Sequence, residues 1–360
     1  MKLGLIARAD NSGLGVQTHE FYKNMAPAKT MVVDISKMNG NKIYPERYPD
    51  GIFIRGIPTE NDIRSFLQGL DVVFIAESAY NPAFYNIARE MGVKTAVQYN
   101  YEFLDWIINP DYPRPDMLIA PSKWHYIDVE RWCGVYNVQH VYLHCPVNQE
   151  LLKPKLIDEA RTFLHVAGRS AAHDRNGTLT VIGASKYLES DANIIIHFQG
   201  EQGLAHQATN SITDYMIYAD NHGNADKLIF QQIDFDNYAE VYEQGDVLLL
   251  PRRYGGNCLP MNEALAIGMP VIATNIEPNN KFLPAHWLID ATVKGSFTPR
   301  THIEIYEARP DTLAQKIDWF YGLGSIDMSV ENAKAKELGD SIGWQVMKKK
   351  YEEVLGGLCQ

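Results

Sequence analysis

Cysteine and long hydrophobic runs are both scarce in this sequence of 360 residues. The four cysteines include no Cys-x-x-Cys pair, which argues against a disulfide framework and against a cysteine-based zinc site. No segment approaches the roughly 18 apolar residues that a membrane-spanning helix requires. The apolar stretch at the N-terminus is too short for a secretory signal peptide. We therefore expect a cytoplasmic protein with reduced thiols and without a metal site.

An excess of positive charge is also lacking. The chain has 33 lysines and arginines against 44 acidic residues, which gives a formal net charge of −11. Proteins that bind nucleic acid over a broad surface usually have a basic face, so the composition disfavours that class without excluding a local groove. The basic run Lys348 to Lys350 lies in a helical pattern, and we interpret it as a solvated helix face.

The sequence does contain two successive regions in which strand patterns alternate with helix patterns. A chain of 360 residues is too long for one average core, so two domains of roughly 150 to 180 residues are expected. Alternation of apolar strands with helices predicts parallel sheets covered by helices on both faces. We therefore predict an α/β fold with two Rossmann-like domains, at residues 1–148 and 149–330, followed by a C-terminal helix at 331–360.

The segment from Pro251 to Thr274 directly follows a short apolar run and has the pattern strand, glycine turn, helix, strand. Gly255 and Gly256 permit backbone conformations in which main-chain N–H groups point into a ligand site. Pro260 suits the first turn of a helix. Since the free N–H groups and the positive dipole end of this helix face the glycine turn, the pattern predicts an anion site, with phosphate as the expected anion.

A second glycine loop contains Gly168, Arg169 and Arg175 between a predicted strand and a predicted helix. Its two arginines and its helix N-terminus are able to hold an anionic group together. The alternative is a surface turn with exposed arginines. His173 and Asp174 in this loop suggest an acid–base pair or a metal ligand, but adjacent residues face one metal poorly and polar turn residues are the commoner case.

A third glycine loop, with Gly13 and Gly15, follows the first predicted strand. Asp34 ends the next strand, and an acidic residue at about this spacing holds the ribose in dinucleotide-binding domains. Thr18, however, stands where the third glycine of that motif belongs. The loop is thus either a tight turn alone or a turn that faces the same cleft as Gly255.

Together these motifs resemble those of the GT-B glycosyltransferases, in particular the retaining family 4 type. Ala167-Gly168-Arg169 is similar to the family's Val-Gly-Arg turn, and Arg175-Asn176-Gly177 looks like the Lys-Gly that follows it, with arginine for lysine. The family's nucleotide-sugar loop is matched at Tyr254, Gly256, Leu259-Pro260, Glu263-Ala264 and Gly268-Met269-Pro270-Val271.

The resemblance implies two Rossmann-like domains that face a central cleft, with a last helix, opened by Trp344, that returns to the first domain. It also implies a nucleoside-diphosphate sugar as the donor substrate, without a further cofactor. Arg169 and Arg175 would neutralise the diphosphate, and Glu263 would bind the ribose hydroxyls. Further donor contacts are implied for Gly13, Gly15, Gly168, Gly255, Gly256, Asn257, Cys258 and Leu259.

The sequence departs from the family's pattern at several positions. Gly255 occupies the place of the first of two glutamates, which binds hydroxyls of the transferred sugar. Cys258 replaces a glycine, and Gln98 stands near the place of a usual histidine. Donor-sugar recognition is therefore altered, or His173 and Asp174 take over part of it.

We accordingly expect a glycosyltransferase that moves a sugar to an acceptor hydroxyl with retention of anomeric configuration. The acceptor is a small molecule, a glycan, a protein or a modified nucleobase, and the oligomeric state is not indicated. The lack of a convincing carboxylate pair disfavours a glycoside hydrolase. Two alternatives are a catalytically silent nucleotide-sugar or glycan-binding protein, which the missing glutamate would suit, and an NAD-dependent oxidoreductase.

Overall fold

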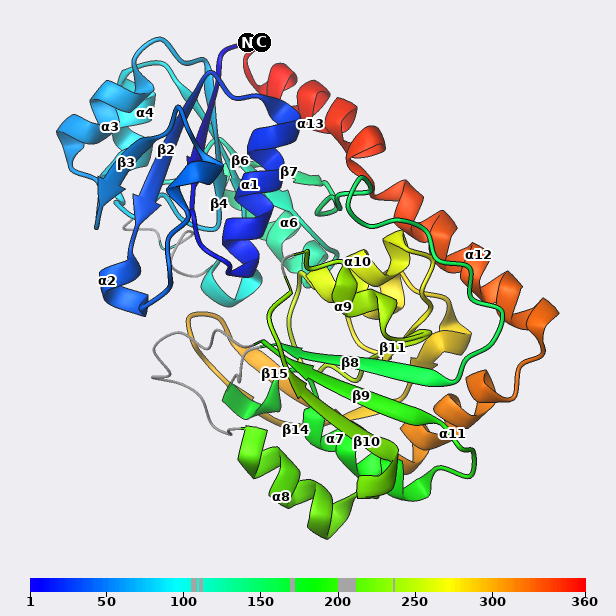
Figure 1. The fold of residues 1–360 in the computed structure, drawn as a ribbon. Coiled ribbons are helices and arrows are strands. Elements are labelled where there is room, and N and C mark those ends of the chain that lie inside the picture. Colours follow the sequence, from blue (N-terminus) through cyan, green and yellow to red (C-terminus); the bar gives the residue numbers. More distant parts are fainter. Residues whose placement is uncertain (105–108, 110–112, 169–171, 200–211, 236) are drawn as a thin grey trace. The chain divides into compact units, whose positions relative to one another are not determined.

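The chain contains two β-sheets of parallel strands, one in each of its two structural units (Figure 1). The computed structural model describes residues 1–104, 109, 113–168, 172–199, 212–235 and 237–360. Unit 1 comprises Met1–Cys145, Pro299–Thr301 and Trp344–Gln360, and unit 2 comprises Pro146–Thr298 and His302–Gly343. The predicted α/β class with two Rossmann-like sheets is confirmed.

The sheet of unit 1 has the strand order of a doubly wound fold. Its parallel strands lie in the order β3 (Ile52–Arg55), β2 (Lys29–Asp34), β1 (Leu3–Ala7), β4 (Val72–Ala76), β5 (Lys94–Gln98), β6 (Met117–Ala120) and β7 (Gln139–Tyr142). The central strands β1 and β4 are buried along their whole length, which explains their unbroken apolar sequences. Between these two strands the strand order reverses, and this reversal creates a topological switch point.

Helices cover both faces of this sheet. The helices of unit 1 are α1 (Gly13–Met25), α2 (Ser36–Asn39), α3 (Glu60–Leu67), α4 (Ala83–Glu90), α6 (Tyr126–Tyr136) and α13 (Trp344–Leu358), and all except the short α2 bury residues. Phe21 of α1 stacks on Phe74 of β4 with ring centroids 4.0 Å apart, and Tyr351 of α13 lies edge-on to both rings. The buried Tyr351 hydroxyl donates to Gln98 Oε1 at 3.0 Å, so the end of the chain is an integral part of unit 1.

The sheet of unit 2 repeats the same topology. Its parallel strands lie in the order β10 (Leu228–Gln232), β9 (Asn193–Phe198), β8 (Thr162–Gly168), β11 (Val247–Leu250), β12 (Val271–Thr274) and β13 (Leu288–Ile289). The helices are α7 (Thr178–Ala184), α8 (Ile212–His222), α9 (Glu240–Glu243), α10 (Leu259–Ala266), α11 (Pro310–Tyr321) and α12 (Ser325–Ser341). The switch point of this sheet therefore lies between β8 and β11.

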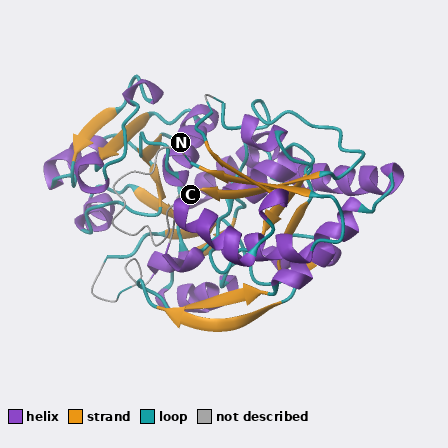
Figure 2. Ribbon diagram, turned by 60° about the horizontal axis from the view of Figure 1, so that its bottom comes forward, coloured by secondary structure: helices purple, strands orange, loops and turns teal. Residues whose placement is uncertain are grey.

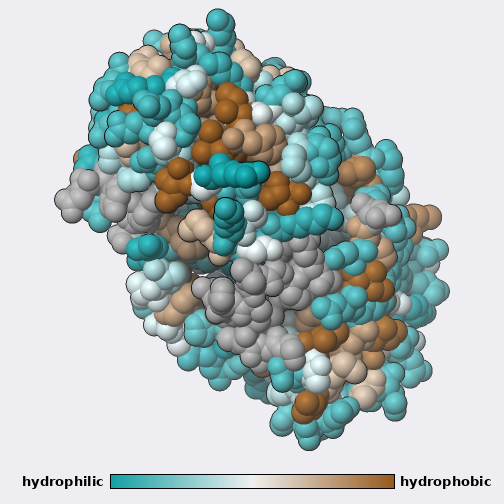
Figure 3. Space-filling model, turned by 60° about the vertical axis from the view of Figure 1, so that its left-hand side comes forward, coloured by the Kyte–Doolittle hydropathy of each residue, from teal (hydrophilic) through white to brown (hydrophobic). Residues whose placement is uncertain are grey.

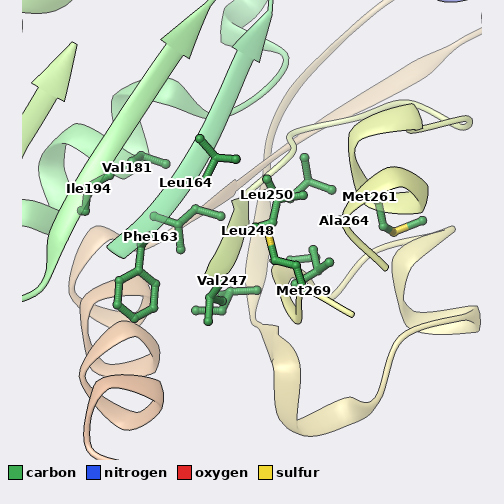
Figure 4. Packing of buried hydrophobic residues seen from close by; sticks show 14 of the residues in the cluster. Phe163, Leu164, Val181, Ile194, Val247, Leu248, Leu250, Met261, Ala264 and Met269 are labelled. Carbon is green, nitrogen blue, oxygen red and sulfur yellow. The ribbon is translucent and has the colours of Figure 1, made fainter. Parts of the chain in front are cut away.

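The core of unit 2 holds these two central strands and α10 together. Figure 4 shows Leu248 and Leu250 of β11 between Phe163 of β8 on one side and Met261 and Ala264 of α10 on the other. All five side chains are at most 3% exposed. Because interiors of this kind are densely packed, the ends of β8 and β11 and the start of α10 are held in place by their apolar neighbours.

Three regions differ from the sequence-based expectations. Residues 52–55, which were not predicted as a strand, form the edge strand β3, whose side chains are largely exposed. An antiparallel hairpin of β14 (Ala291–Phe297) and β15 (Ile303–Ala308) follows the sheet of unit 2, and Figure 2 shows its two long strands alongside each other. The region 331–360 is not one helix, since α12 ends at Ser341.

The break between α12 and α13 contains Gly343. This residue forms a parallel β-bridge with Val147, and a Cβ atom on it would lie 1.9 Å from Gln149 Oε1. The chain is therefore extended there, and the helix restarts at Trp344.

The surface carries no extended hydrophobic belt on the face shown in Figure 3, which is largely hydrophilic with a few hydrophobic side chains among the polar ones. Among the described residues, none of the helices has both the length and the hydrophobicity needed to cross a membrane.

Close packing of α10 on α12 predicts a strong effect at Gly339. A Cβ atom there would lie 2.3 Å from the carbonyl oxygen of Leu265, so Gly339→Ala must separate the helices at a cost of roughly 1–3 kcal/mol in the free energy of unfolding. Gly356 of α13 has open space around its Cβ position, and Gly356→Ala should stabilise the helix by up to about 1 kcal/mol. Thermal unfolding of both variants checks this, and equal shifts would argue against the packing constraint.

Candidate functional site

Two glycine-containing loops meet at the switch point of unit 2. The first spans residues 168–177 and follows β8, and the second spans residues 251–258 and follows β11. Because β8 and β11 are adjacent and parallel, both loops leave the same edge of the sheet. Open α/β sheets bind their ligands at this position.

The two loops are joined through their backbones at Gly177. This residue has a φ of +73°, and a Cβ atom on it would lie 2.1 Å from the carbonyl oxygen of Pro251. Beside this contact, the Arg253 amide donates to the Arg175 carbonyl at 2.9 Å. Arg253 Nη1 also donates to the carbonyl of His173 at 2.7 Å. The first loop is thus fixed to the second by a close backbone approach, a backbone hydrogen bond and the side chain of Arg253.

His165 of β8 holds the same junction from inside the core. Its side chain is fully buried, with Nδ1 2.9 Å from the Leu249 carbonyl oxygen and Nε2 3.0 Å from Thr178 Oγ1. Since a carbonyl only accepts, Nδ1 carries the proton and Nε2 accepts from the threonine hydroxyl. Burial lowers the pKa of His165 to about 4. A neutral imidazole therefore links β11 to the start of α7.

Asp174 closes the N-terminus of α7. Its two carboxylate oxygens accept from the amides of Thr178 and Leu179, both at 3.0 Å, and Tyr215 donates its hydroxyl at 3.3 Å. Burial raises the pKa of Asp174 to about 6, against the lowering effect of these hydrogen bonds. His173, predicted with it as a polar turn pair, is exposed and packs on Phe297 of β14. Within the described residues, no group of three or more His, Cys, Asp or Glu side chains could hold a metal ion.

Two guanidinium groups converge on Gly255. The nearest nitrogens of Arg175 and Arg252 lie 2.6 and 2.7 Å from the position that a Cβ atom on Gly255 would occupy. Gly255 has a φ of +118°, a conformation that L side chains rarely adopt. Arg175 also lies over the ring of the buried Tyr254, with its Cζ 5.2 Å from the ring centroid. This edge of the loop is therefore strongly cationic.

The helix α10 starts directly after these glycines. Its N-cap residue is Cys258, which makes no side-chain capping hydrogen bond, so the first turn keeps its positive end toward the loop. Glu263 lies one turn further along and is buried, and Tyr242 of α9 donates a short hydrogen bond to its Oε2. Burial, together with this carboxylate, raises the pKa of Tyr242 well above its usual range. Tyr242 thus orients one oxygen of Glu263.

The N-terminal glycine loop lies at the switch point of unit 1. Gly13 is exposed at the start of α1, whereas Gly15 is buried, and a Cβ atom on Gly15 would lie 2.1 Å from the Asp10 carbonyl oxygen. The Asp10 carboxylate is buried and accepts from Arg8, Asn41 Nδ2 and Ser12. Burial alone would raise the pKa of Asp10, but the Arg8 cation and these hydrogen bonds lower it overall. Asp10 therefore shapes this loop.

The structure gathers most of the sequence-predicted site residues in unit 2. One group lies in the two loops and α10, and comprises Gly168, Arg175, Gly255, Gly256, Asn257, Cys258, Leu259 and Glu263. Gly13 and Gly15 belong to unit 1, and Arg169 lies outside the described residues. Sequence reasoning missed two residues, Arg252 and Tyr242. The one available signal for Arg252 was its place directly after a buried strand, at the ligand-binding edge of the sheet.

The junction at Gly177 gives a testable prediction. Gly177→Ala should lower the melting temperature by several degrees and disrupt the loop, because its Cβ atom would overlap the Pro251 carbonyl. Gly92 is a matched control, since it has a similar φ of +71° but open space at its Cβ position. Gly92→Ala should show only the smaller cost of backbone strain, on the order of 1 kcal/mol. A comparable loss of stability in both variants would contradict the proposed contact.

His165 predicts a pH dependence of stability. Its folded pKa of about 4 lies below the unfolded value of 6.5. The contribution of His165 to the free energy of unfolding is therefore constant above pH 6.5 and is lost as the pH falls toward 4. The expected slope is about 1.4 kcal/mol per pH unit in this window. Urea denaturation at several pH values gives the free energy of unfolding of the wild type and of His165→Gln. Between pH 4 and 6.5, the two slopes of this free energy against pH should differ by the amount that corresponds to one proton. Parallel pH profiles would show that His165 does not titrate on unfolding.

Comparisons with known proteins agree with this architecture. Residues 149–321, just under half of the chain, match the family model described as Glycosyl transferases group 1. A search of curated protein sequences gives no match. The matched segment contains both loops of unit 2, α10 and Glu263.

Solved structures match over most or nearly all of the chain. The Anabaena protein HepE in complex with UDP is 11% identical with a TM-score of 0.72, over 99% of this chain and 100% of that one. Sucrose-phosphate synthase from Thermosynechococcus elongatus is 14% identical with a TM-score of 0.70, over 99% and 98%. The pneumococcal O-GlcNAc transferase GtfA is 15% identical with a TM-score of 0.58, over 82% of this chain and 60% of that one. The chain therefore has the GT-B fold, and its segment 149–321 matches the group 1 glycosyl transferases.

Proposed function

We propose that this protein is a glycosyltransferase that uses a nucleoside-diphosphate sugar. One observation carries the proposal: the Arg175 cation and the uncapped start of α10 both face the glycine loop 255–258, at the switch point of unit 2. A cationic side chain and free main-chain amides suit a diphosphate, which is both the recognised group of the donor and the leaving group of the reaction.

The comparisons support this substrate class. The segment that carries these features is the one that matches Glycosyl transferases group 1. The HepE structures, which share the fold, are complexes with UDP, with UDP and glucose, and with UDP-glucose. A uridine nucleotide is thus the first donor to test on this chain.

The predicted charged residues and the glycine loops have separate roles in this proposal. Arg175, with Arg169 by resemblance, neutralises the diphosphate, and the amides from Gly256 to Cys258 bind its oxygens. Glu263 accepts from the ribose hydroxyls, and Tyr242 fixes the orientation of its carboxylate. The loop of Gly13 and Gly15 is assigned to the acceptor side by the same resemblance.

The proposed reaction exchanges one bond for another at the anomeric carbon. The bond from this carbon to the diphosphate oxygen breaks, the acceptor oxygen takes its place, and the hydroxyl proton passes to the leaving phosphate. Stabilising the departing diphosphate and positioning the acceptor are the two tasks of the protein. Transfer on one face would retain the anomeric configuration, as in family 4, and a cytoplasmic location stays part of the prediction.

Nucleotide binding gives the direct test. UDP, GDP, ADP and dTDP should be compared by thermal shift, and at least one should raise the melting temperature. Arg175→Gln should weaken that nucleotide roughly tenfold to a hundredfold, because a charge-assisted contact to phosphate is lost. Arg309→Gln is a suitable control, since Arg309 is exposed and pairs with Asp311. Absence of a shift with every nucleotide would overturn the proposal.

A measurement of turnover distinguishes a transferase from a catalytically silent binding protein. The second alternative is kept because Gly255 stands where the family has a glutamate. Release of nucleoside diphosphate from the donor is measured with and without sugar, peptide and nucleoside acceptors. Binding without release under all of these conditions would favour the binding protein. Analysis of the anomeric product by NMR then decides whether the configuration is retained.

A further inference from the structure

Arg252 is a buried cation that lacks an anionic partner among the residues that the structure describes. Its side chain is 7% exposed, and its Nη1 donates to the Asn257 carbonyl at 3.1 Å. Its Nε is buried without a hydrogen-bond acceptor in the described part of the chain. Among the described residues, no carboxylate oxygen lies within 4.0 Å of the Arg252 guanidinium, the distance limit of an ion pair. A buried guanidinium in this state is costly unless a ligand supplies the missing acceptor.

The adjacent Arg253 shows what a structural arginine looks like in the same loop. Arg253 donates to the carbonyls of His173 and Tyr306 and lies 3.7 Å from Glu307 Oε1. Its charge is thus balanced within unit 2. Arg252 instead directs Nη2 toward the backbone of Gly255, 2.7 Å from the position that a Cβ atom would occupy there, and next to the guanidinium of Arg175.

The diphosphate does not account for both cations. It already has Arg175, the main-chain amides of the loop and the positive end of α10. Arg252 adds a full further charge, and its repulsion with Arg175 is relieved best by an anion between the two groups. Two neighbouring guanidinium groups match a planar group with two oxygens, which is the geometry of a carboxylate.

We propose that the donor of this protein is a nucleoside-diphosphate uronate, and that Arg252 binds the carboxylate of the transferred sugar. This inference rests on the proposed function. The absence of a side chain at Gly255 allows both guanidinium groups to approach the donor loop, where this carboxylate would lie. A neutral hexose would leave Arg252 buried and its charge unbalanced, so Arg252 is a residue that determines donor specificity.

Donor binding to the wild-type protein tests the inference. The two probes carry the base that gives the largest shift in the nucleotide panel, and for uridine they are UDP-glucuronate and UDP-glucose. Isothermal titration calorimetry should give a dissociation constant roughly tenfold or more lower for the uronate. Equal affinity, or tighter binding of the hexose, would overturn the inference and leave the proposed function intact. Failure of every nucleoside diphosphate to bind would overturn both.

Substitution of Arg252 locates the preference. Arg252→Gln should abolish the difference between the two probes and leave the affinity for the nucleoside diphosphate alone nearly unchanged, whereas Arg252→Lys should keep part of the difference. Arg309→Gln removes one positive charge from an exposed position of unit 2, and this variant should keep the full difference in affinity between the two probes. An equal loss of affinity for the free diphosphate and for the uronate in Arg252→Gln would place Arg252 at the diphosphate and overturn the inference. Should this variant fold poorly, the wild-type comparison still decides.

Discussion

The contact between the backbone of Gly177 and the carbonyl of Pro251 is the constraint on which the candidate site depends. It brings two loops from adjacent strands within van der Waals distance, and only a residue without a side chain permits this approach. Because the Arg253 amide then donates to the Arg175 carbonyl, the start of the Arg175 side chain is positioned by main-chain geometry. His165 supports the same junction from the core side. Preorganisation of this kind is what binding of a charged leaving group requires.

The fold could be predicted from the sequence wherever burial determines composition. Strands with both faces buried, such as Val72–Ala76, leave an unbroken apolar run that few other structures explain. The edge strand Ile52–Arg55 was missed although its sequence Ile-Phe-Ile-Arg is apolar, because it is short and follows a stretch rich in polar residues and proline. The strand Ala291–Phe297 was missed because its side chains are mostly exposed and show no buried face. Pairing with a neighbour, which the sequence does not display, decides whether such segments become strands.

The site was predictable to a similar extent and for a related reason. Glycines with positive φ, such as Gly177 and Gly255, leave a trace in the sequence because other residues rarely adopt these conformations. Arg252 and Arg253, by contrast, are adjacent and chemically identical. Which of them balances its charge within the protein depends on His173, Tyr306 and Glu307, and these residues are brought to the loop only by the tertiary fold. The net charge of −11 likewise does not show that the loop around Gly255 is cationic, because the local charge depends on which side chains lie close together and not on the total.

Two helices begin at the switch point of unit 2, and the capping by Asp174 makes them unequal. The carboxylate of Asp174 occupies the first amides of α7, so this helix terminus is already neutralised by the protein itself. The N-cap of α10 holds only Cys258, whose thiol makes no such bond. An incoming anion therefore meets one closed terminus and one open one, and the fold assigns it an orientation before any side chain contacts it. In the proposed donor complex, a single aspartate at the start of α7 would thereby determine that the diphosphate lies toward α10.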